Sequence, residues 1–174
     1  MDTNEVRGAD KKEAFHEAAE AKIKSFKLEV PDIDTGGQKI HIKLAGTNST
    51  RASVQVLRNG ADNNLHYHPN LDLIYMVLKG CVRFYGPDEK VLGEFHQNEG
   101  LLLPENSRYW FGSVGDEEAW LLQIAGYPKG EKAVKRINVD PPKKSLGGKW
   151  LGMTQEEVDH MDEVVLGHKR SPGE

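Results

Sequence analysis

The chain has 174 residues, a formal net charge of -4 and one cysteine, Cys81. This length fits one domain around one core. A single cysteine excludes an internal disulfide and thiolate-rich zinc knuckles, which favours a reducing compartment. The sequence has no long basic cluster with interleaved aromatic residues, so nucleic acid is not expected as a partner.

The N-terminal stretch MDTNEVRGADKKEAF contains no apolar run that could act as a signal peptide. No later run approaches the ~18 apolar residues that a membrane-spanning helix needs. We therefore expect a cytoplasmic protein without a membrane partner.

The first predicted element is an amphipathic helix over Lys11–Lys27. Asp10 and Glu13 have the spacing of a capping pair. Apolar residues then recur at helical spacing: Phe15, Ala19, Ile23 and Phe26. We expect this apolar stripe to lie against a larger body.

From Ile40 the apolar period changes from helical spacing to two, which is typical of strands. Glycine-containing turn signals separate the short apolar runs. The predicted strands are Ile40–Leu44, Val54–Val56, Leu73–Leu78, Cys81–Tyr85, Val91–Phe95, Leu101–Leu103, Tyr109–Phe111 and Ala119–Ile124. This rhythm predicts an antiparallel sandwich or barrel.

The segment YPKGEKAVKRINVDPPKKSLGGKW is rich in Lys, Gly and Pro, which indicates an irregular strap over the barrel. Thr154 and Glu157 then form a capping-box pattern, and Val158, Met161 and Val165 an apolar stripe, which predict a short C-terminal helix. The expected division is a helical extension at 1–36, a barrel at 37–130, and the strap with its short helix at 131–174.

The sequence His66-Tyr67-His68 has the pattern of half a metal site. Side chains at positions i and i+2 of a strand share a face, so His66 and His68 can hold one divalent ion from one side. A nearby carboxylate such as Asp72 would complete a two-histidine, one-carboxylate triad with open positions for substrate, water or dioxygen.

Residues from about Val54 to Ile124 resemble the cupin superfamily of small, RmlC-like jelly-roll barrels. The first cupin motif is matched by Gly60, five residues, His66 and His68, and later Gly80. The second motif is matched less well, because Asn98 and Asn106 stand at its glycines and Tyr109 stands at its histidine. The resemblance implies an all-β cupin double-stranded β-helix (jelly-roll) barrel, here with an N-terminal helix and a short C-terminal helix.

The resemblance implies a bound divalent metal ion (Fe, Mn, Zn or Ni) with His66, His68 and Asp72 as candidate ligands. Counting forward from His68 places the acidic position at Asp72, whereas counting back from Gly80 places it at Leu73. A shift of one residue turns a strand side chain to the opposite face. Asp72 is therefore either a ligand or a residue that caps the turn before its strand.

Tyr109, at the position of the missing histidine, is the candidate catalytic residue, as a proton donor or an oxyanion stabiliser; the alternative is ordinary interior packing. Arg83 could hold a substrate carboxylate by a bidentate pair, or it could face solvent. Strand parity adds four further candidate substrate-binding residues: Tyr85, Tyr75, Gln55 and Trp110. The remaining histidines are expected at the surface: His16, His41, His96, His160 and His168.

These patterns leave three functions open. The first is a metal-dependent lyase, isomerase or dehydratase acting on a small molecule, and the second is a non-haem iron dioxygenase. The third is a non-catalytic cupin that binds or senses a small ligand. The resemblance also implies a homodimer that pairs through its sheets.

Overall fold

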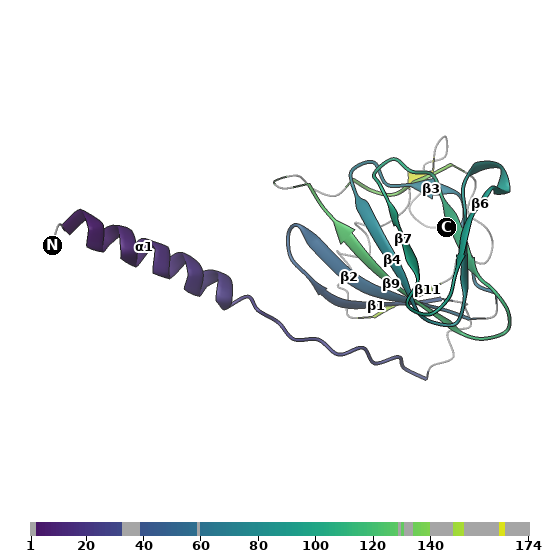
Figure 1. Cartoon of the computed structure of the whole chain (residues 1–174), viewed down its shortest axis with the longest axis horizontal. Helices are drawn as coiled ribbons and strands as arrows, with labels where there is room; N and C mark the ends of the chain where they lie inside the picture. Colours follow the sequence, from purple (N-terminus) through teal and green to yellow (C-terminus); the bar gives the residue numbers. More distant parts are fainter. Residues whose placement is uncertain are drawn as a thin grey trace, which may run out of the picture.

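The computed structural model describes residues 3–32, 39–58, 60–128, 130, 134–139, 148–151 and 164–165. Its larger layer is a six-stranded sheet that forms one wall of the barrel (Figure 1). In spatial order its strands are β11 (Gly148–Leu151), β1 (Lys39–Gly46), β2 (Thr50–Leu57), β9 (Ala119–Gly126), β4 (Asp72–Lys79) and β7 (Gly100–Leu103). All pairs in this sheet are antiparallel except β1 with β11.

Two three-stranded sheets form the other layer. One contains β6 (Val91–Phe95), β5 (Val82–Tyr85) and β8 (Trp110–Ser113), and the other contains β12 (Val164–Val165), β10 (Ile137–Asn138) and β3 (His66–Tyr67). A short 3-10 turn, η1 (Pro87–Glu89), joins β5 to β6. An isolated antiparallel bridge joins His66 of β3 to Tyr109, the residue before β8, and a second joins Asp62 to Gly112 of β8. The fold is a jelly-roll barrel, which the cupin resemblance implied; the strand rhythm alone had predicted a sandwich or a barrel.

The period-two pattern sorts side chains between the interior and exterior of the barrel. The inward residues form one apolar core cluster: Leu57, Ala61, Leu71, Leu73, Tyr75, Val77, Val82, Phe84, Leu103, Tyr109, Phe111, Ala119, Leu121 and Ala125. Four aromatic rings of this cluster, Tyr75, Phe84, Tyr109 and Phe111, contact one another, and Phe95 packs against Phe84. Large rings therefore fill this part of the barrel.

The outer face of the six-stranded sheet is also apolar. Ile40, Ile42, Val54 and Val56 form a second buried cluster there. Leu28 and Val30, which precede the barrel in the chain, pack against it. Farther along the same face, Ile74, Met76 and Leu102 remain 47%, 39% and 60% exposed.

The predicted N-terminal helix is present as α1 (Thr3–Glu20), but its bounds differ from Lys11–Lys27. Phe15, Ile23 and Phe26 are 71%, 80% and 59% exposed, so the expected apolar stripe is not buried. Figure 1 shows α1 apart from the barrel, followed by an extended segment. Leu28 and Val30 pack on the sheet from this segment, and their period of two replaces the helical repeat.

The eight predicted strands are all present, with small differences at their ends. The strap, predicted to be irregular, contributes β10 and β11 to the barrel. Thr154, Glu157, Val158 and Met161 of the predicted C-terminal helix lie outside the described residues, and Val164–Val165 at its end form β12. Among the described helices, none is both long and apolar enough to cross a membrane.

Candidate functional site

A group of polar side chains lies inside the barrel, beside the aromatic core. His66 is 2% exposed and is held on β3 between two neighbours: Asn138 of β10 pairs with it, and Tyr109, the residue before β8, forms an isolated bridge with it. The backbone N–H of His66 donates to the Tyr109 carbonyl at 3.0 Å, and the Tyr109 N–H donates to the His66 carbonyl at 2.9 Å. These bonds place the His66 and Tyr109 rings 4.3 Å apart between centroids.

Further hydrogen bonds fix the side chains of this group. Nδ1 of His66 lies 2.8 Å from the Asn64 carbonyl oxygen. The hydroxyls of Tyr75 and Tyr109 lie 3.0 Å apart. Across the six-stranded sheet, the Gln55 amide donates to the Gln123 Oε1 at 3.1 Å. Of the predicted site residues, the structure thus brings together His66, His68, Tyr109 and Tyr75, and it places Gln55 on the same interior surface.

Both histidines of the His-x-His motif are neutral at physiological pH. Burial lowers the pKa of His66 well below 6.5, with further lowering by Arg136 and His68. Burial, followed by the charges of Arg136 and Arg51, lowers the pKa of His68 to about 3. Neutral imidazoles can accept hydrogen bonds or bind metal ions, but they add no positive charge of their own.

His41 belongs to the same interior group, so its expected surface position was wrong. Burial lowers its pKa well below 6.5, and Lys39, Arg136 and Arg51 lower it further. The signal was in the sequence: Ile40 and Ile42 face outward from β1, so the residue between them faces inward. The charged neighbours of His41 obscured this parity.

The interior therefore has a positive electrostatic potential. Lys39 is 6% exposed, and its ammonium lies 5.3 Å from the centroid of the Phe111 ring. Arg136 donates from Nε to the Asn138 Oδ1 at 2.9 Å and from Nη2 to the Asn64 Oδ1. The charges of Lys39, Arg51 and Arg136 are among the causes that lower the pKa values of the three histidines.

The two tyrosines of the group keep their protons. Burial raises the pKa of Tyr75 to about 12. Burial and the Tyr75 phenol raise the pKa of Tyr109 well above 10. At neutral pH both hydroxyls are thus hydrogen-bond donors rather than phenolates.

Asp72 does not join the histidines. It lies on the exposed face at the start of β4, opposite in parity to buried Leu73, and its Oδ1 accepts a hydrogen bond from the Glu105 N–H at 3.0 Å. The count back from Gly80 gave the correct register, because Pro69 and Asn70 interrupt the strand geometry after His68. The hydrogen bond from the Glu105 N–H to Asp72 is of the capping kind that the alternative prediction gave for this residue.

Tyr85 and Trp110 lie outside the barrel, contrary to the pocket-lining prediction, and Arg83 adopts the solvent-facing alternative. Arg83 pairs with Glu94 on the neighbouring strand β6, with 2.7 Å between Arg83 Nε and Glu94 Oε2. Tyr85 stacks on Trp110 at 3.9 Å between ring centroids, with 7° between the ring planes. The inward residues of these strands are Phe84 and Phe111.

The interior donor set meets the needs of a metal ion only in part. His66 and His68 supply two neutral nitrogens, whereas protein metal centres generally have three or four protein ligands. Within the described ranges, the only group of three histidine, cysteine or carboxylate ligand atoms close enough to share an ion is Cys81, Glu94 and His96, on the outside of the barrel.

Comparisons with known proteins identify the fold. An RmlC-like cupin protein from Desulfovibrio desulfuricans is 19% identical with a TM-score of 0.51, over 60% of this chain and 96% of that one. A protein with a double-stranded β-helix domain from Klebsiella pneumoniae is 13% identical with a TM-score of 0.50, over 60% of this chain and 81% of that one. No protein-family model and no curated protein matches the chain. The chain has the cupin fold.

The buried neutral histidines make stability depend on pH. Unfolding returns the pKa of His66 and His68 to about 6.5, so below that pH the unfolded chain binds protons that the folded chain does not. The contribution of these histidines to the free energy of unfolding is fully present above about pH 7. It decreases as the pH drops toward 3, by about 1.4 kcal/mol per pH unit for each such histidine. Urea unfolding between pH 7.5 and 5.5 measures this slope. His68→Gln should reduce the slope, whereas the exposed-site control His16→Gln should leave it unchanged; an equal slope in all three proteins would contradict the expectation.

Proposed function

We propose that this protein binds a small anionic molecule, a carboxylate, inside its cupin barrel. Arg136 supplies the charge partner, and the Tyr75–Tyr109 hydroxyl pair supplies one hydrogen-bond donor, because the other hydroxyl proton is used between the two phenols. This is the ligand-binding or sensing function among the three that the sequence left open.

The positive potential at the histidines carries the proposal. Lys39, Arg51 and Arg136 all act on the group that contains the His-x-His motif. A positive potential in a low-dielectric interior favours an anion over a cation. A guanidinium recognises a carboxylate through paired hydrogen bonds, which gives Arg136 the natural role of anchor.

The tyrosines support binding more than catalysis. A phenol with a raised pKa holds its proton at neutral pH, so the Tyr75–Tyr109 pair can donate one hydrogen bond to an oxyanion, and Tyr109 is a weak acid for proton transfer. Lyase, isomerase or dehydratase chemistry through Tyr109 would need a ligand that lowers this pKa. The dioxygenase hypothesis needs a facial carboxylate, and Asp72 lies outside.

Carboxylate binding should raise thermal stability. With succinate or benzoate as probes at about 100 times the dissociation constant, the folded state gains about 2.7 kcal/mol. Arg136→Gln should weaken binding by at least about tenfold, because it removes a charge-assisted hydrogen bond. Isothermal titration and thermal melts measure both effects.

The matched control is Arg108→Gln, which removes the same charge from an exposed position. Equal loss of binding in both variants would indicate a nonspecific charge effect. No binding of any carboxylate by the wild-type protein would contradict the proposal.

The second candidate is a divalent metal ion on His66 and His68, with non-oxidative small-molecule chemistry. The specific support is the contact between His66 Nδ1 and the Asn64 carbonyl at 2.8 Å. A carbonyl only accepts, so Nδ1 carries the proton and Nε2 carries the lone pair that a metal requires. A bound ion would act as a Lewis acid toward a substrate oxygen.

Elemental mass analysis of protein purified without chelator tests the metal candidate. About one ion per chain, lost in His66→Ala and retained in Asp72→Ala, is the result expected if the two histidines hold the ion. Metal content that His66→Ala leaves unchanged would rule out this candidate.

We also propose that the chain forms a homodimer through the outer face of β4, β7 and β9. On this face the exposed Ile74 is in register with Leu102 on one side and with Ile124 on the other. Leu28 and Val30 pack against the cluster of β1 and β2 residues, while Ile74, Met76 and Leu102 stay exposed. A contiguous exposed apolar patch on a sheet is typical of a protein interface.

Charge substitution in this patch should prevent dimer formation, because it would bury an unpaired ammonium in an apolar interface. We expect sedimentation velocity to give a dimer for the wild type and a monomer for Leu102→Lys. Val91→Lys is the control, since Val91 is an apolar residue that is 55% exposed on β6. A monomeric wild type, or a dimer that survives Leu102→Lys, would contradict this interface.

A further inference from the structure

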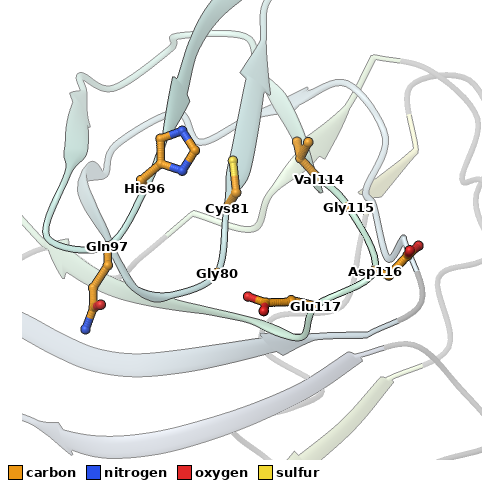
Figure 2. A pocket seen from close by; sticks show the side chains of 8 residues that line it. All are labelled: Gly80, Cys81, His96, Gln97, Val114, Gly115, Asp116 and Glu117. Carbon is orange, nitrogen blue, oxygen red and sulfur yellow. The ribbon is translucent and has the colours of Figure 1, made fainter.

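A group of possible metal ligands lies outside the barrel, where β5 and β6 form a hairpin. The register pairs Val82 with Phe95 and Arg83 with Glu94, so Cys81, which precedes β5, lies across from His96. One sulfur, one carboxylate oxygen and one imidazole nitrogen from Cys81, Glu94 and His96 all lie within 4.8 Å of one another. Figure 2 shows Cys81 and His96 side by side on neighbouring strands.

Two neighbouring residues fix these ligands in place. Arg83 binds the Glu94 Oε2, which leaves Oε1 directed toward His96, at 3.7 Å from Nε2. The carboxylate of Glu99 accepts a hydrogen bond from the His96 backbone N–H at 2.8 Å and so holds the turn after β6. Partners of this kind orient metal ligands in known sites.

The surroundings favour a cation. An open pocket of about 450 Å³ adjoins the group and is lined by Gly80, Cys81, His96, Gln97, Val114, Gly115, Asp116 and Glu117 (Figure 2). Carboxylates predominate around the group: they belong to Asp116, Glu117, Glu94 and Glu99. Arg83 is the cation that pairs with Glu94. The pocket leaves room for water to fill the fourth position of a tetrahedral ion.

We propose that Cys81, Glu94 and His96 form a surface site for a transition-metal ion such as Zn²⁺. A mixed sulfur, nitrogen and oxygen donor set suits Zn²⁺ or Co²⁺ and does not suit Mg²⁺ or Ca²⁺, which bind oxygen. In a tetrahedral zinc site the ligand atoms lie roughly 3.3–3.8 Å apart, so the observed separations need only small side-chain rotations. With three protein ligands, the ion keeps an open position toward the pocket.

Co²⁺ is a suitable probe, because a bound thiolate gives an intense ligand-to-metal charge-transfer band in the near ultraviolet. The reduced, metal-free full-length protein is titrated with Co²⁺ and then with Zn²⁺ as a competitor. We expect a band that saturates at about one ion per chain and disappears when Zn²⁺ is added. Cys81→Ser should abolish the band. His96→Ala and Glu94→Gln should each weaken Co²⁺ binding by more than about tenfold.

Two control variants distinguish this surface site from the barrel interior and from a nonspecific charge effect. His66→Ala changes the barrel interior and should leave the band intact, so the proposed interior function and the surface site can fail independently. Glu89→Gln removes one exposed negative charge from η1 and should have little effect. No band in the wild type would overturn the proposal. A band that His96→Ala and Glu94→Gln leave unchanged would also overturn it, because the thiol would then bind the ion alone.

Discussion

The paired backbone hydrogen bonds between His66 and Tyr109 are the contact on which the barrel interior depends. They join the short strand β3 to Tyr109, the residue before β8, and so connect the two small sheets into one layer opposite the six-stranded sheet. They also bring the first histidine of the motif against the phenol that replaces the expected histidine. Because β10 pairs with the other side of β3, Arg136 and Asn138 reach the same group. The His66–Tyr109 bridge therefore both links the parts of this layer and brings the candidate site residues together.

Strand parity explains most of what the sequence could predict. Where an alternating run is unbroken, as in β1, β4 and β9, the sequence predicts the element and separates inward from outward residues. The same rule places His41 inside, although its charged neighbours suggest a surface position. Counting from His68 could not assign the face of Asp72, because Pro69 and Asn70 interrupt the alternation between the two residues. Strand parity left both positions open for Arg83, because an alternation defines two faces without saying which one is inside. The rings of Phe84 and Phe111 take the interior, so Arg83 faces outward.

Two parts of the structure could not be predicted from local sequence patterns: the position of Arg136 and the group of Cys81, Glu94 and His96. β10 is two residues long in a segment rich in Lys and Gly, and only its non-local pairing with β3 and β12 makes it a strand. Arg136 therefore gave no signal in the sequence, although its charge acts on all three interior histidines. The Cys81, Glu94 and His96 group was hidden in a similar way. The spacing of its members along the chain matches no common ligand motif, and only the β5–β6 register brings them together.

The interior histidines lie among cations, whereas the surface group of Cys81, Glu94 and His96 contains a carboxylate. Protonation is therefore coupled differently to the binding of a ligand at each place. An anion near His66 and His68 would raise the pKa values that burial and Arg136 lower. Anion binding and histidine protonation therefore reinforce each other. At the surface, burial and Glu94 raise the pKa of the Cys81 thiol, so a metal ion must displace a proton to bind. Acidification weakens that site. The three interior histidines lie among cations, whereas His96, the one histidine of the surface group, lies beside the carboxylate of Glu94.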